Sequence, residues 1–364
     1  MTVDSVSIKN FRNITDLSFS AHDGVNVIYG ENAQGKTNIL ESIWLFTGCK
    51  SFRGAKDAEF IKFGEEFAKI QLDFKDKTRE KTSEIIFSEK KKTVKQNGVE
   101  LRSTTELIGT FYAVIFSPIH LSLIKDGPSA RRKFLDTALC EIKPGYAENL
   151  ANYKRALIQR NALLKDLHMS SQLYDLLDSW DDQLARYSAV VINERLKYLE
   201  MLSEYSKKIY SGISDNKECF SVEYSRNEAD KSISVRDLYL KELELLKEAR
   251  KEDIINKTTS VGPHRDDILI NINGVSARSY ASQGQQRSCA LALKLGESEI
   301  IEKITGEVPV ALLDDVMSEL DEKRQDYILN HINDRQVFLT CCDPSQVLRL
   351  CGGKSFLIKG GELK

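Results

Sequence analysis

A glycine-rich segment near the start of the chain has the spacing of a phosphate-binding loop. The pattern G-x-x-x-x-G-K-[ST] is met by Gly30, Glu31, Asn32, Ala33, Gln34, Gly35, Lys36 and Thr37, with Asn38 next. Glycines let backbone N–H groups close around phosphate oxygens, and the start of a following helix adds partial positive charge. The Lys36 ammonium suits the β- and γ-phosphates, and the Thr37 hydroxyl suits Mg²⁺. We therefore predict a nucleoside triphosphate site here rather than an unliganded glycine-rich turn.

A second candidate lies where the apolar run 310–313 ends in two acids, Asp314 and Asp315. A buried parallel strand that delivers carboxylates at its C-terminal edge is where phosphoryl chemistry occurs in such sheets. Asp314 would hold Mg²⁺ opposite Thr37, directly or through water, and Asp315 would polarise the attacking water. Taken alone, the motif leaves open a strand followed by a solvated acidic turn.

A third segment, Ser282, Gln283, Gly284 and Gln285, opens a predicted helix that continues through Ile301. By itself this segment indicates only a helix N-cap followed by a turn glycine.

The elements around these segments predict a mixed α/β lobe. A short buried strand at 25–29 ends at Gly30, and a helix with one apolar face follows at 38–47. Alternating residues predict further strands at 3–8, 17–19, 70–74, 84–87, 93–95 and 268–272. Asn97 and Gly98 predict a tight hairpin turn, because both tolerate positive φ.

The period changes from about Ser129, where apolar residues recur at three- and four-residue spacing. The stripe from Leu173 to Ile209 would reach on the order of 55 Å as one helix. A polar stretch at 212–230 and a helix at 235–252 follow. We therefore expect an ATPase domain from 1–125 and 254–364, with an inserted helical arm domain at 126–253.

The composition fits a globular protein with about two domains at roughly 150 residues each: 364 residues, 41% hydrophobic, 29% charged, net charge −2. The charge argues against a histone-like polycation but permits a DNA-binding face. No run of about 18 apolar residues and no signal-peptide pattern occurs, so neither a membrane span nor secretion is expected. Seven cysteines without a C-x-x-C pair fit the reducing cytoplasm better than a disulfide or zinc framework.

The three motifs in this order resemble the ABC-type ATPases. The signature loop of that superfamily aligns with Ser282, Gly284 and Gln285, and its D-loop with Ser318 and Asp321. In the superfamily the signature loop caps the γ-phosphate held by the other protomer, so two nucleotides are sandwiched in a two-fold dimer. The resemblance thus implies ATP, Mg²⁺ and an ATP-dependent homodimer.

Further matches cover nearly the whole chain and resemble the RecF family, in the Rad50/SMC branch of these ATPases. They are Asn10 to Asn13, Gly127 to Asp136, Gly262 to Asp267, Ser282 to Arg287 and Leu313 to Asp321. The resemblance implies an α/β ABC-type ATPase head, a P-loop mixed sheet with an antiparallel β subdomain, plus an inserted helical arm. It also implies nucleotide contacts from Arg12 and Asn13.

The function implied by this resemblance is recombinational DNA repair. The family's proteins act with RecR and RecO at gaps, near junctions of single- and double-stranded DNA, to load RecA onto strands coated by single-strand binding protein. The expected activity is a slow, DNA-stimulated hydrolysis of ATP to ADP and phosphate, with the dimer closing over duplex DNA. RecR is a partner by resemblance only.

Three positions depart from the superfamily pattern. Asp315 stands where a glutamate is usual, which predicts slow hydrolysis, and Thr340 stands in place of the switch histidine. Residues 116–118 replace the usual Q-loop glutamine, and His120 falls where the family leads us to expect an acid. His264 would serve the nucleotide-side turn or the dimer interface rather than proton transfer.

Candidate DNA contacts are three basic clusters: Lys50, Arg53 and Lys56; Lys90, Lys91, Lys92 and Lys95; Arg131, Arg132, Lys154, Arg155 and Arg160. Each cluster taken singly could equally be a solvated charged face.

Three other functions remain open. The first is an SMC or Rad50 head with an unusually short arm. Proteins of those families carry far longer heptad arms than residues 129–252 can supply. The second is a transporter ATPase, which would show a coupling glutamine and a switch histidine. The third is a structural DNA clamp that binds ATP with negligible turnover, and the Asp315 and Thr340 substitutions make it the strongest rival.

Overall fold

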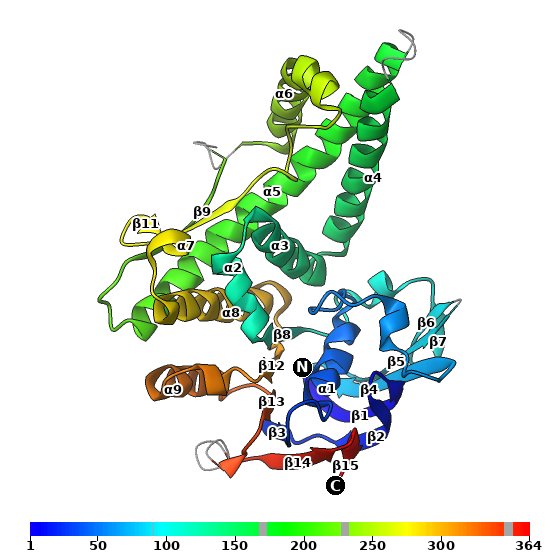
Figure 1. Ribbon diagram of the computed structural model, residues 1–364, viewed down its shortest axis with the longest axis vertical. Helices are drawn as coiled ribbons and strands as arrows, with labels where there is room; N and C mark the ends of the chain where they lie inside the picture. The colour runs from blue at the N-terminus through cyan, green and yellow to red at the C-terminus, as the bar shows by residue number, and fades with distance from the viewer. Residues whose placement is uncertain (90, 167–172, 227–232, 346–351) are drawn as a thin grey trace.

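Six strands from distant parts of the chain form the central sheet, in the order β15-β14-β3-β13-β12-β8. In the computed structural model (Figure 1), which describes all residues except 90, 167–172, 227–232 and 346–351, β3 pairs in parallel with β13 and β14, and β12 with β13 and β8. The strands span Val25–Tyr29 (β3), Ala113–Phe116 (β8), Val310–Asp314 (β12), Val337–Cys341 (β13), Lys354–Lys359 (β14) and Glu362–Leu363 (β15). The predicted strands at 25–29 and 310–313 are confirmed.

A second, antiparallel sheet lies beside the first, in the order β2-β1-β4-β5-β6-β7. Its strands are Thr2–Phe11 (β1), Ile14–Ser20 (β2), Phe67–Lys75 (β4), Glu80–Ser88 (β5), Lys92–Gln96 (β6) and Val99–Leu101 (β7). The predicted hairpin turn is confirmed, with φ of 49° at Asn97 and 81° at Gly98. Helix α1 (Lys36–Trp44) shares one apolar core with both sheets.

Strand alternation divides the buried residues of the central sheet between two cores. Ile28, Leu312 and Phe338 face the core shared with α1 and the antiparallel sheet. Val27 and Leu313 face the opposite core, which reaches the helical arm. The central sheet therefore separates two apolar cores, one around α1 and the other reaching the arm.

The arm consists of α3 (Pro128–Ile142), α4 (Pro144–Asp166), α5 (Leu173–Ile213) and α6 (Val235–Asn256). The long helix expected from the 173–209 stripe is confirmed, since α5 is one helix of 41 residues. Figure 1 shows α4 and α5 running side by side away from the sheets. Helix α6 packs against α5.

A small third sheet pairs β9 (Phe220–Tyr224), β10 (Ile268–Ile272) and β11 (Val275–Ser276). We expected only a polar stretch at 212–230, and β9 shows that this interpretation was wrong for its middle. Phe220 and Val222 alternate with polar residues and are buried, which suffices for a strand once β10 lies beside it.

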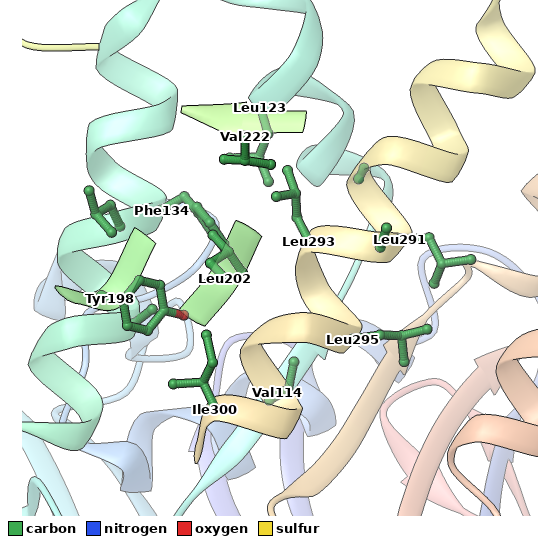
Figure 2. Packing of buried hydrophobic residues seen from close by; sticks show 14 of the residues in the cluster. Val114, Leu123, Phe134, Tyr198, Leu202, Val222, Leu291, Leu293, Leu295 and Ile300 are labelled. Carbon is green, nitrogen blue, oxygen red and sulfur yellow. The ribbon is translucent and has the colours of Figure 1, made fainter. Parts of the chain in front are cut away.

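Helix α8 (Gln283–Thr305) joins the arm to the central sheet. Figure 2 shows Leu293 and Ile300 of α8 near Tyr198 and Leu202 of α5, and Val114 of β8 close by. The remaining helices of the described residues are α2 (Ser122–Lys125), α7 (Ala277–Tyr280), α9 (Glu322–His331) and the 3-10 turns at Leu45–Thr47, Asp57–Phe60, Thr104–Leu107, Pro118–Leu121 and Met317–Glu319. Within the described ranges, none of the helices has the length and apolar character needed to cross a membrane.

Candidate nucleotide site

The loop between β3 and α1 requires glycine at both ends. Gly30 has φ of +148°, and a Cβ there would lie 2.3 Å from the carbonyl oxygen of Ile358. Gly35 has φ of +109°, and its Cβ would lie 2.8 Å from Oδ1 of Asn13. Backbone approach this close explains the glycine spacing in physical terms.

Lys36 turns its side chain into this loop. It is the first residue of α1 and only 8% exposed, and its Nζ donates to the carbonyl oxygens of Gly30 at 2.5 Å and Glu31 at 2.9 Å. A compact cation at a helix N-terminus is suited to bind anionic phosphate oxygens.

Thr37 meets the first acid of the 310–315 segment. Its Oγ1 donates to Oδ1 of Asp314 at 2.7 Å, although the two residues are 277 positions apart. The Thr340 hydroxyl donates to the same oxygen at 3.1 Å, and the Ser117 hydroxyl lies 3.4 Å from Oδ2. The two sequence motifs that carry chemistry thus converge at one edge of the sheet.

The surroundings of Asp314 fit a divalent cation. The residue is 7% exposed, and burial raises the pKa of its carboxyl group, an effect that the Thr37 and Thr340 hydroxyls partly offset. A cation beside this buried carboxylate would relieve that desolvation cost. Hydroxyl and carboxylate oxygens are the ligands Mg²⁺ prefers, and it commonly takes only one or two protein ligands with the phosphates supplying others. Among the described residues no cluster of three His, Cys, Asp or Glu competes for that role.

Asp315 sits just past the strand in a left-handed conformation, with φ of 52°. Its backbone N–H donates to Oγ1 of Thr340 at 2.9 Å. The Ser318 hydroxyl donates to its carbonyl oxygen at 2.9 Å and lies 3.1 Å from its carboxylate Oδ1. Asp321 caps α9 by accepting the N–H of Arg324 at 3.0 Å. The structure thus brings Asp315 and Ser318 together.

The two residues expected from the N-terminal motif occupy different places. Asn13 lies against the loop, where its Nδ2 donates to the carbonyl oxygen of Ala33 at 3.2 Å and its Oδ1 accepts from Asn38 at 2.7 Å. The Arg12 guanidinium instead forms two hydrogen bonds with the buried carboxylate of Glu41, at 2.7 and 3.0 Å. Arg12 therefore braces α1 one turn beyond the loop.

Gln34 and Asn32 of the loop have partners elsewhere in the chain, and one of these partners, Cys342, was not predicted from the sequence. Oε1 of Gln34 accepts from the N–H of Gly360 at 2.5 Å. The Cys342 Sγ lies 3.8 Å from Nζ of Lys36 and 3.4 Å from Oδ1 of Asn32. Cys342, which follows β13, therefore faces the loop, while Thr340 within β13 bonds Asp314. The available signal for Cys342 was its position after a strand lying between β3 and β12.

The signature-like segment starts α8. The Ser282 hydroxyl accepts the N–H of Gln285 at 3.2 Å, and the Gln285 side chain accepts the N–H of Ser282 at 2.8 Å, a reciprocal capping box. Ser282 and Gln283 are exposed, and Gly284 lies under Arg324, whose Nη2 would be 3.3 Å from an added Cβ. In Figure 1 this start of α8 lies beside α7, at the opposite end of α8 from the side where α1 lies.

Two residues expected to contact DNA are buried in ion pairs, so those two predictions are wrong. Arg131 is 6% exposed and bonds both carboxylate oxygens of Asp267, at 2.7 and 2.8 Å. Arg160 is fully buried between Asp181 and Asp253, at 2.6 and 2.7 Å. A basic residue type within a predicted helix does not by itself distinguish a buried arginine such as Arg131 or Arg160 from one on the surface.

The other basic candidates that the structure describes lie on or near the surface. Lys50, Arg53, Lys56, Lys154 and Arg155 are exposed, and Arg132 donates to the carbonyl oxygen of Asp266. Three hairpin lysines form ion pairs with acids: Lys91 with Glu100, Lys92 with Asp57 and Lys95 with Glu84. Lys90 lies outside the described residues.

His264 and His120, the two histidines noted in the sequence, both have hydrogen-bond partners within the chain. His264 lies against the arm, with Nδ1 2.5 Å from the Tyr153 hydroxyl and Nε2 3.0 Å from the carbonyl oxygen of Thr259. His264 thus contacts α4 and the segment before β10 rather than the nucleotide-side turn, and a role in the dimer interface stays a prediction. His120 accepts the N–H of Ser117 at 3.0 Å, and burial lowers its pKa.

Comparisons with known proteins agree along the whole chain. The family model "RecF/RecN/SMC N terminal domain" matches residues 2–350. The chain is 40% identical over 372 residues to "DNA replication and repair protein RecF" of Lachnospira eligens, covering 100% of this chain and 99% of that protein. It is 42% identical to the protein of the same name from Agathobacter rectalis, over 94% of this chain and 92% of that one.

Solved structures give the same result. The structure described as "the recombination mediator protein RecF-ATP in RecFOR pathway" matches with a TM-score of 0.92 at 40% identity, over 100% of this chain and 97% of that one. A Pyrococcus furiosus Smc head domain matches at 15% identity with a TM-score of 0.57, which shows the fold alone. The expected ABC-type ATPase head is confirmed, and the chain belongs to the RecF family of DNA replication and repair proteins.

Proposed function

We propose that this chain is a slow, DNA-stimulated ATPase of recombinational DNA repair, which hydrolyses ATP to ADP and phosphate. The observation that carries this proposal is the 2.7 Å hydrogen bond between Thr37 and Asp314, which joins the phosphate loop to the acid-bearing strand. The relatives solved with ATP support the choice of nucleotide.

Each group has a role that follows from its position. The N–H groups of the loop 30–37 and the Lys36 ammonium bind the triphosphate. Thr37 and Asp314 would hold Mg²⁺, which when bound supplies charge neutralisation at the phosphate oxygens. Asp315 orients and polarises the attacking water, while Ser318 fixes its carboxylate.

A second copy of the chain would complete the site. Ser282 and Gln283 are exposed at the free start of α8, and the Ser282 oxygen acts as an acceptor within its own helix. Its hydroxyl proton and the first N–H groups of α8 remain suited to a phosphate held by a partner. ATP-dependent, two-fold dimerisation follows, with each signature segment (residues 282–285) capping the other protomer's γ-phosphate.

We further propose that the closed dimer holds duplex DNA. Exposed Lys50, Arg53 and Lys56 follow α1, where they can contact phosphates without reading sequence. By family, the protein would act with RecR and RecO at single-strand gaps and at junctions with duplex DNA to promote RecA loading. Residues 1–125 and 254–364 would form the ATPase domain and 126–253 the arm, with the β9–β10 pairing as their seam.

Two features of Asp315 favour a second function, an ATP-gated DNA clamp with negligible turnover. Asp315 is one methylene shorter than glutamate, and its carboxylate lies within hydrogen-bonding distance of the Ser318 hydroxyl. Both features limit its reach towards a water molecule.

ATPase rates with and without duplex DNA, for the wild type and Asp315→Ala, separate the two functions. The enzyme proposal expects stimulation by DNA and a large loss in the variant. No stimulation together with an equally fast variant refutes it. ATP-dependent dimerisation on DNA, seen by sedimentation without turnover, supports the clamp.

A further inference from the structure

The side chain of Gln285 is held at both ends of its amide. Its Oε1 accepts the N–H of Ser282 at 2.8 Å, while its Nε2 donates to Oε1 of Glu218 at 2.7 Å. A carboxylate can only accept hydrogen bonds, so the amide nitrogen must face Glu218 and the amide oxygen must face Ser282. Glu218 therefore fixes which way the Gln285 amide points.

The other oxygen of Glu218 is bound to the long arm helix. The hydroxyl of Tyr210, in α5, donates to Oε2 of Glu218 at 2.6 Å. Tyr210 is fully buried, and its ring stacks on Phe220 at the start of β9, with centroids 4.8 Å apart and planes 12° apart. Burial raises the pKa of Tyr210, so the phenol remains a donor at neutral pH. One carboxylate thus connects α5 to the start of α8.

The end of α5 also fits closely against the helix that follows the D-loop. A Cβ at Gly212 would lie 2.6 Å from Oη of Tyr327 in α9. From the same helix, Nε of Arg324 donates to Oγ of Ser288 in α8 at 2.8 Å. A displacement of α5 can therefore reach the start of α8 through α9 and Arg324 as well as through Glu218, but only Glu218 bonds the Gln285 side chain.

We propose that Glu218 is a positioning residue for the half of the nucleotide site that each chain offers its partner. It orients the Gln285 amide, and it ties that orientation to the arm through Tyr210. This inference rests on the proposed ATP-dependent dimer. Without the carboxylate, the Gln285 amide loses its fixed orientation, the Ser282 N–H loses its partner, and the capping box that shapes the start of α8 loosens.

The experiment measures ATP-dependent dimerisation by sedimentation and ATP binding by the monomer. For Glu218→Ala we expect monomer ATP affinity within twofold of wild type. Loss of a hydrogen bond to a charged group weakens each signature contact about tenfold. A two-fold dimer contains two such contacts, so its dissociation constant should rise about 100-fold. Glu218→Gln is the matched control: its oxygen can accept from Gln285 and its amide can donate to the Tyr210 hydroxyl, so dimerisation should recover to within about threefold of wild type.

A double-mutant cycle distinguishes positioning from general loss of structure. If Glu218 acts through Gln285, then Glu218→Ala combined with Gln285→Ala dimerises no more weakly than Gln285→Ala alone. Additive losses, or wild-type dimerisation by Glu218→Ala while Ser282→Arg fails to dimerise, overturn the role of Glu218 and leave the dimer proposal standing. If Ser282→Arg dimerises like wild type with ATP, both the dimer proposal and this inference fall.

Discussion

Removing the buried guanidinium of Arg160 should destabilise the arm more than any change to its exposed charges. Arg160 Nε bonds Asp181 at 2.6 Å, and its Nη1 bonds Asp253 at 2.7 Å and Thr259 at 2.8 Å. Both carboxylates are fully buried. An Arg160→Met substitution keeps the apolar stem but leaves two buried negative charges without this partner.

The structure sets the size of the effect. Breaking a buried ion pair by removing one partner costs about 3–5 kcal/mol. The remaining carboxylates are not left bare, because Arg250 still bonds Asp181 at 2.7 Å and the Ser260 N–H still bonds Asp253 at 2.9 Å. We therefore expect the lower value, about 3 kcal/mol of arm stability. With a urea slope of about 2–3 kcal/mol per M, the unfolding midpoint falls by about 1–1.5 M.

Tryptophan fluorescence can report the arm alone. The chain has two tryptophans. Trp44 lies in the core around α1, and Trp180 packs in the arm against Leu164 and Leu177. In a Trp44→Phe background, urea unfolding of Arg160→Met is compared with Arg186→Met, whose guanidinium bonds Asp182 on the exposed face of α5. The control should leave the midpoint unchanged. Equal midpoints for the two variants would refute the argument from burial.

The remaining predictions concern the phosphate loop. Lys36→Met should lower ATP affinity about 10- to 100-fold, measured by equilibrium dialysis, because the phosphates lose a charged donor. Gly30→Ala should abolish ATP binding altogether, since its Cβ would meet a backbone carbonyl oxygen at 2.3 Å, whereas Gly54→Ala, with positive φ but open space, should bind ATP normally. ATP should protect Cys342 from iodoacetamide in mass-spectrometric mapping; unchanged labelling would contradict its placement beside Lys36. Cys341 should stay unlabelled at pH 8, because burial raises its pKa to about 11 and leaves little thiolate.

The elements that carry the phosphate loop were predictable because their signals are local. The strand before Gly30 and the helix after Gly35 are specified by neighbouring apolar residues and by backbone that only glycine tolerates. The 41-residue helix α5 was equally accessible, since an apolar stripe over many turns has few alternatives.

What escaped prediction depends on partners far along the chain. The sequence around Arg160 predicts a surface charge, because its partner Asp253 is 93 positions away along the chain. The position of Cys342 near Lys36 could not be predicted, because the two residues are 306 positions apart. They meet because β13, which precedes Cys342, lies beside β3, which leads into the phosphate loop. The strand β9 is five residues long and needs β10 to define it. No local pattern encodes these pairings.

The Gly262 to Asp267 motif, which the sequence linked to the RecF family, contacts three elements of the arm. Its Asp267 bonds Arg131 of α3, its Asp266 accepts from Tyr224 of β9, and its His264 meets Tyr153 of α4. All three partners belong to the expected arm, so the motif fastens the arm to the segment that leads into α8.

Helix α8 shares one apolar core with α5, whereas α1 and most of the antiparallel sheet lie in the other core. A displacement of the arm should therefore move the signature segment of the same chain more directly than it moves α1. Because the proposed dimer places each signature segment on the partner's γ-phosphate, such a displacement would act on the partner's nucleotide rather than on the nucleotide bound by the same chain. We therefore predict that stimulation by DNA requires the dimer: at protein concentrations below the dimer dissociation constant, duplex DNA should leave the ATPase rate unchanged.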